Sequence, residues 1–78
     1  MIDKKEVSFA ELVDAEPLMQ WFKFEHLPKH LQVVSGEFYS LACTLLVVIE
    51  RGPERTVALR KLLESKDAAV RARVCAGG

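Results

Sequence analysis

Residues 31–74, LQVVSGEFYSLACTLLVVIERGPERTVALRKLLESKDAAVRARV, decide the expected fold. In the first part, apolar side chains recur at alternating spacings of three and four, at Leu31, Val34, Phe38, Leu41, Leu45 and Val48. This is the period of a helix that packs along its whole length against another helix. Residues 41–49 are apolar on every face, so one partner helix cannot cover them.

A break at Gly52 and Pro53 separates this segment from a second helical pattern. Glycine suits the left-handed position after a helix end, and proline suits the first position of the next helix. Because the connection is short, the two helices must fold back on each other. Lys66 lies on the rim of the second apolar seam. That seam is formed by Leu59, Leu62, Leu63, Ala69 and Val70.

The N-terminal part is expected to hold a shorter helix. Residues 1–7 have no periodicity and are expected to be mobile, and Ser8 to Glu11 form a capping-box pattern that begins a helix. Pro17 ends this helix or restarts it, and Pro28 begins the long helix. Gly36 interrupts the long helix, which suggests close approach of another backbone.

We therefore expect an all-α fold, an antiparallel two-helix hairpin preceded by a short N-terminal helix. Residues 1–22 form the N-terminal extension and residues 23–78 the helical-hairpin domain. Such a short chain buries too little surface to be comfortably stable alone. We expect a homo-oligomer that forms through the apolar residues 41–49.

Several function classes are disfavoured. Cys43 and Cys75 do not have the spacing of a disulfide framework, and no apolar run approaches the ~20 residues of a membrane span, so we expect a cytoplasmic protein without membrane contact. His26 and His30 have a ligand-like spacing, but Pro28 lies between them and no third ligand is near, so no metal or other cofactor is expected. No set of nucleophile, base and oxyanion site indicates an enzyme.

The charge distribution makes the second helix the candidate surface for binding an anion. The net charge is zero, which argues against nucleic-acid binding. From Arg51 onward, however, seven basic residues stand against three acidic ones. Ion pairs such as Arg60 with Glu64 and Asp67 with Arg71 would make the basic surface of this helix an ordinary solvent-exposed face without a ligand. Lys66, beside the apolar seam, is instead suited to hold a phosphate while a ring stacks a base.

The helical pattern and the basic second helix also occur together in a known protein family. The chain resembles the helical-hairpin family of small phage proteins, which includes the anti-CBASS cyclic-oligonucleotide sponges and shares its hairpin with anti-Thoeris sponges. The similarity covers residues 22–73. It is carried by Lys23-Phe24-Glu25-His26, by Phe38-x-x-Leu41-Ala42, by the block from Gly52 to Glu64 with its Lys-Leu-x-Glu run, and by Ala68-Ala69-Val70-Arg71-Ala72.

The resemblance implies a phage anti-defence protein in the cytoplasm of the infected host cell. It would sequester cyclic di- or trinucleotide messengers at subunit interfaces without cleaving them. Phe24 and His26 stand where the family has an aromatic residue and a histidine, Arg55 at its arginine after the turn, Lys61 at the lysine of its Lys-Leu-x-Glu run, and Arg71 near the end of its second helix. With Lys66, these residues form the expected ligand site.

Two other functions remain open. The chain could be a protein-binding module, an inhibitor or adaptor of a host protein, that uses its apolar first helix or its N-terminal helix and has no nucleotide ligand. It could also be a small DNA-binding regulator that uses the basic helix. The neighbouring acidic residues and the zero net charge weaken this last interpretation.

Overall fold

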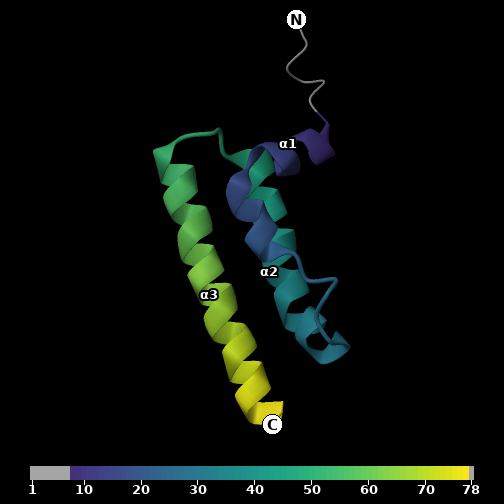
Figure 1. The fold of residues 1–78 in the computed structure, drawn as a ribbon. Coiled ribbons are helices and arrows are strands. Elements are labelled where there is room, and N and C mark those ends of the chain that lie inside the picture. The colour runs from purple at the N-terminus through teal and green to yellow at the C-terminus, as the bar shows by residue number, and fades with distance from the viewer. Residues whose placement is uncertain (1–7, 78) are drawn as a thin grey trace, which may run out of the picture.

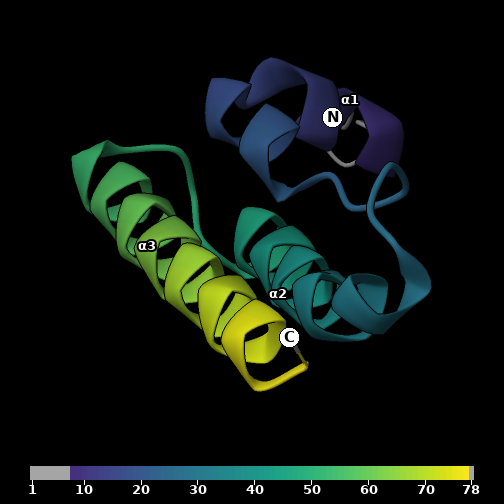
Figure 2. The same cartoon turned by 60° about the horizontal axis from the view of Figure 1, so that its bottom comes forward.

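The computed structural model describes residues 8–77, so the expectation for residues 1–7 lies outside it. Within this range the chain is all-helical, as predicted, with α1 (Phe9–Ala15), the 3-10 helix η2 (Pro17–Phe22), α2 (Lys29–Val48) and α3 (Pro53–Gly77). α2 and α3 lie side by side and run in opposite directions (Figure 1). Figure 2 shows α1 and η2 as a second layer across this pair.

The helix starts follow the local sequence signals. Ser8 Oγ accepts a hydrogen bond from the Glu11 N–H at 3.2 Å, and the Ser8 N–H donates to Glu11 Oε1 at 3.1 Å, so the capping box is confirmed. Pro17 and Pro53 are the first residues of η2 and α3. Pro28 immediately precedes α2 as its N-cap. At these positions a missing N–H removes no intrahelical hydrogen bond.

The core lies where η2 packs on the α2–α3 pair. A 3-10 helix repeats every three residues, so Met19 and Phe22 share one face of η2, and both are buried. They pack with four buried residues of α2 and α3: Ala42, Cys43, Leu46 and Leu59. At the edge of this cluster, a hydrogen bond with the Cys43 side chain and partial burial raise the pKa of Tyr39 above its usual value.

The predicted apolar stripe of α2 is wrong at two of the three positions in its C-terminal half, whereas Leu45, the third, packs against the core. Leu41 and Val48 are 48% and 67% exposed, whereas Ala42, Cys43 and Leu46 are buried. Residues 41–49 are apolar all round, so their periodicity does not choose a face. The packing partners make the choice, because α3 and the layer of α1 and η2 cover one side of α2 and leave Leu41, Val47 and Val48 exposed.

The connection between α2 and α3 also differs from the expectation. α2 ends at Val48, and its C-cap residue Ile49 is extended, with φ −119° and ψ 128°. Gly52 does not adopt a left-handed φ. Arg55 Nη1 donates to the Ile49 carbonyl oxygen at 3.2 Å. A side chain of α3 thus satisfies a carbonyl beyond the end of α2, and the glycine is not needed as a left-handed cap.

By length and composition alone, α2 could cross a membrane. It has 20 residues, with an 18-residue window of mean hydropathy 1.6, so the expectation that no segment reaches this length is wrong. In the structure, 22% of that window is buried against the rest of the chain. The exposed surface of α2 carries the apolar residues Val33, Leu41, Val47 and Val48 together with polar ones such as Lys29 and Glu37.

A buried ion pair joins the two layers. Arg55 Nη2 donates to Glu16 Oε1 at 3.0 Å, and each side chain is 8% exposed. The Glu16 carboxylate also accepts from the Leu18 N–H at the start of η2, at 3.4 Å. Nearby, Arg51 Nη2 donates to the Ala15 carbonyl oxygen at 3.4 Å. Arg55, predicted to bind a ligand, is thus occupied with holding η2 against the start of α3.

We expect Arg55→Met to lower the free energy of unfolding by about 3–5 kcal/mol, because it leaves the Glu16 carboxylate buried without its partner. The double variant Glu16→Leu/Arg55→Met should be closer to the wild type, since it buries no charge. Urea denaturation followed by circular dichroism measures both. The exposed Arg60→Met serves as the control, and a double variant no more stable than Arg55→Met would contradict this account.

Phe24, also predicted to bind a ligand, is used by the fold. Its ring centroid lies 5.5 Å from that of Tyr39, with an interplanar angle of 56°. A Cβ placed on Gly36 would lie 3.5 Å from Phe24 Cε2, which is ordinary van der Waals contact. The neighbour of Gly36 is thus an aromatic ring rather than the expected backbone, and the site has room for a methyl group.

Gly36→Ala should therefore raise the free energy of unfolding by about 0.5–1 kcal/mol, because alanine favours the helix interior and meets no clash. Thermal and urea denaturation measure the change. Gly52→Ala, in the connection and with nothing within 4 Å of the added Cβ, is the matched control and should change stability less. A loss of stability in Gly36→Ala would show that the Phe24 ring lies too close to residue 36 to accept a methyl group.

Candidate functional site

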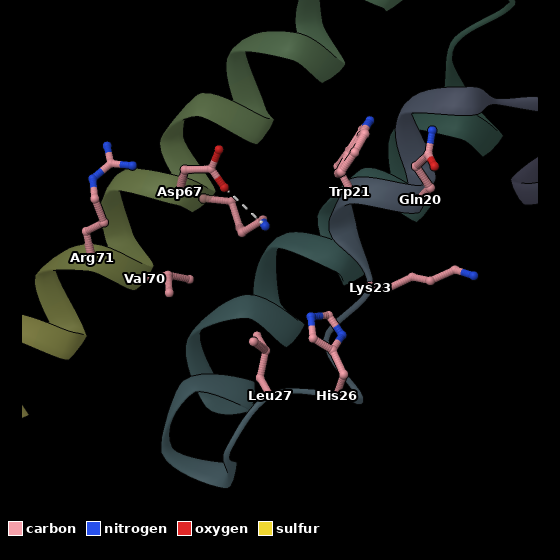
Figure 3. Close-up of a pocket in the computed structure, with 9 residues that line it drawn as sticks. Gln20, Trp21, Lys23, His26, Leu27, Asp67, Val70 and Arg71 are labelled. Carbon is pink, nitrogen blue, oxygen red and sulfur yellow. Dashed lines mark ion pairs between the residues drawn. The ribbon is translucent and has the colours of Figure 1, made fainter.

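A groove of about 430 Å³ lies between α3 and the segment formed by η2 and the following loop. Its walls come from residues far apart in sequence, which the two-layer fold brings together (Figure 3). The lining residues are Gln20, Trp21, Lys23, His26, Leu27, Lys66, Asp67, Val70 and Arg71. Leu27 and Val70 provide apolar surface, and most of the other side chains are ionisable or can donate hydrogen bonds.

Cations outnumber anions in this groove. Lys23, Lys66 and Arg71 are basic, and Asp67 is the one carboxylate among the lining residues. Lys66 Nζ lies 3.2 Å from Asp67 Oδ1, and the Lys66 side chain is only 13% exposed. Lys23 and Arg71 extend outward from opposite walls (Figure 3). The groove thus holds one fixed lysine and has two cations at its margins that can turn toward an anion.

An aromatic surface faces α3 from the opposite wall. Trp21 is 58% exposed, although Met19 and Phe22 on either side of it in η2 are buried. The period of three that buries Met19 and Phe22 turns Trp21 to another face. His26 lies on the same side of the groove (Figure 3). An exposed indole beside cations can stack a planar ligand and attract a cationic group.

Three of the six predicted ligand residues, His26, Lys66 and Arg71, come together in this groove. The other three lie elsewhere. Phe24 packs against Tyr39, and Arg55 pairs with Glu16 in the interior. Lys61 is exposed on α3, with Nζ 3.8 Å from Glu64 Oε1, and does not line the groove.

The expected surface ion pairs are not those of the structure. In place of Arg60 with Glu64 and Asp67 with Arg71, the pairs on α3 join Lys61 to Glu64 and Lys66 to Asp67. The second pair has a physical consequence for the site. Asp67 is committed to Lys66, which leaves Arg71 outside any ion pair among the described residues.

Sequence reasoning missed six of the nine residues that line the groove: Gln20, Trp21, Lys23, Leu27, Asp67 and Val70. The signal for Trp21 was present, since the six residues that begin at Pro17 have apolar positions three apart, at Met19 and Phe22, and three is the period of a 3-10 helix. Asp67 was considered only as an ion-pair partner. Within residues 8–77, no group of three or more His, Cys, Asp or Glu side chains could hold a metal ion.

Comparison of the chain with models of protein families, with characterised proteins and with solved structures finds no match.

Trp21 is the one tryptophan of the sequence, so its fluorescence reports the groove. We expect iodide to quench it more strongly than caesium at low ionic strength, because three basic side chains surround it against one carboxylate. The difference should shrink as salt is raised toward 1 M, where the Debye length falls to about 3 Å. Free N-acetyltryptophanamide is the control. Stronger quenching by caesium would contradict a cationic groove.

Proposed function

We propose that this chain binds a cyclic di- or trinucleotide in the groove between η2 and α3 and sequesters it without cleaving it. The observation that carries the proposal is that one groove is lined by Trp21 and His26 on one wall and by Lys66 and Arg71 on the other. A nucleotide needs both surfaces at once, since it combines an anionic phosphate with a flat base.

The cations of the groove suit a phosphate. Lys66 acts as a point charge, and it is partly covered, so its charge is less screened than that of a fully exposed lysine. The guanidinium of Arg71 is free to form paired hydrogen bonds with two phosphate oxygens. Lys23 adds a third positive charge from the other wall.

The aromatic wall suits a base. Stacking of a base on an aromatic side chain contributes about 1–3 kcal/mol. The exposed indole of Trp21 offers such a surface, and Leu27 and Val70 add apolar contacts among the residues that line the groove. This replaces the role that the resemblance gave to Phe24.

We further propose that α2 and α3 form the hairpin unit of a homo-oligomer. Leu41, Val47 and Val48 are exposed side chains of α2 that a second copy would cover. One groove of this size suits one nucleotide unit, and a cyclic ligand has two or three, so a neighbouring copy would bind the remainder. The cyclic ligand and the phage defence setting rest on the resemblance described above.

A protein-binding module is the second candidate. A shallow groove of about 520 Å³ runs between α1 and the C-terminal end of α2, lined by Leu12, Ala15, Leu46–Arg51 and Arg55. Its exposed apolar side chains include Val47 and Val48. Substitution of these valines by serine would abolish such binding, whereas Lys66→Ala would leave it intact.

The test is calorimetry and thermal shift with cyclic di- and trinucleotides and cyclised ADP-ribose isomers. We expect at least one ligand to raise the melting temperature and to be recovered chemically unchanged after heat release. Trp21→Ala should weaken binding about 5–150-fold, as expected from a lost stacking contact of about 1–3 kcal/mol. Lys66→Ala should weaken it as well.

Arg60→Ala is the matched control, because it removes a cation from the same helix outside the groove. Equal losses in Arg60→Ala and Lys66→Ala would show that binding does not use the groove. Absence of binding by every ligand would favour the protein-binding module.

A further inference from the structure

The Asp67 carboxylate is the feature of the groove that phosphate binding does not explain. It is half exposed, at 50%, and its Oδ1 atom lies 3.2 Å from Lys66 Nζ. A carboxylate repels a phosphate and weakens the nearest cation for it. Its presence among the lining residues therefore points to a part of the ligand that donates hydrogen bonds.

Guanine is the base whose donors match a carboxylate. Its Watson–Crick edge presents the N1–H and N2–H groups side by side and parallel, so they can meet the two oxygens of one carboxylate. Adenine presents one amino group next to an acceptor nitrogen, which a carboxylate repels. An ionised carboxylate only accepts hydrogen bonds, and each of its oxygens has two lone pairs.

The Lys66 contact leaves room for this recognition. The ion pair brings Lys66 Nζ to 3.2 Å from Oδ1 alone, so both lone pairs of Oδ2 and at least one of Oδ1 are open to a ligand. The same contact holds the carboxylate in place on α3. Trp21 lies on the opposite wall, where a base that reaches Asp67 can stack (Figure 3).

We propose that the groove selects guanine, with Asp67 accepting hydrogen bonds from N1–H and N2–H of a base that stacks on Trp21. The inference rests on the proposed nucleotide function and specifies its ligand. Gln20, beside Trp21, adds an amide that can donate to guanine O6. Lys66 has three Nζ donors, so it can still meet a phosphate together with Arg71 and Lys23.

Asp67→Asn separates base recognition from charge. The asparagine keeps the shape but replaces one acceptor by a donor, so it loses the paired contact with guanine. It also removes the repulsion of phosphate. Guanine and adenine ligands should therefore respond in opposite directions, which a general loss of folding would not produce.

The experiment measures affinities of the wild type and Asp67→Asn for cyclic diguanylate, cyclic diinosinate and cyclic diadenylate. Inosine lacks the 2-amino group and so tests the N2–H contact alone. The wild type should bind the guanine ligand about ten-fold or more tighter than the adenine ligand, with inosine between them. In Asp67→Asn the guanine ligand should bind more weakly and the adenine ligand more tightly.

Glu64→Gln is the matched control, since it neutralises an exposed acid on α3 outside the groove and should keep the guanine preference. Equal binding of guanine and adenine ligands by the wild type would overturn the inference and leave the proposed function standing. A guanine preference that survives in Asp67→Asn would also overturn it. If the protein binds none of these three ligands but binds another nucleotide, guanine selection is rejected and the proposed function stands. If it binds no nucleotide at all, both proposals are overturned.

Discussion

The buried ion pair between Glu16 and Arg55 is the constraint on which the arrangement of this chain depends. It joins two residues 39 positions apart and fixes the start of η2 against the start of α3. Burying two charges is costly, and Arg55 Nε has no hydrogen-bond partner in the structure, so the pair contributes more to choosing this arrangement than to its stability. With η2 held there, Met19 and Phe22 enter the core, and Trp21 of the same turn is left facing α3.

The local features of the fold could be predicted from sequence, because each depends on neighbouring residues. The Ser8 capping box, the proline starts of η2 and α3 and the long apolar helix all follow from such signals. What failed was the choice of the buried face in residues 41–49. A segment that is apolar on every side carries no periodic information, so the packing of α3 and of the layer of α1 and η2 decides which face is buried.

The site was predictable in part for the same reason. Lys66 and Arg71 belong to one helix, so the sequence could place both on the basic second helix, although at five residues apart, about 140° around the axis, they do not share one face. Arg55 was misjudged because its partner lies in another layer, and no local pattern links an arginine to a glutamate 39 residues away. Phe24 was assigned to the site through the resemblance, and its contacts with Tyr39 and Gly36 could not be predicted, because no local pattern links it to residues of the following helix.

The length of α3 has a consequence for the groove. The molecule measures 53 × 23 × 16 Å, and residues 71–75 of α3 are exposed. Backbone amides in such uncovered turns open and exchange with solvent more readily than those near Leu59. One wall of the groove thus stands at the boundary between the packed and the fraying part of the helix. A molecule bridging Trp21 and Arg71 would protect these amides, and its affinity would be reduced by the cost of ordering them.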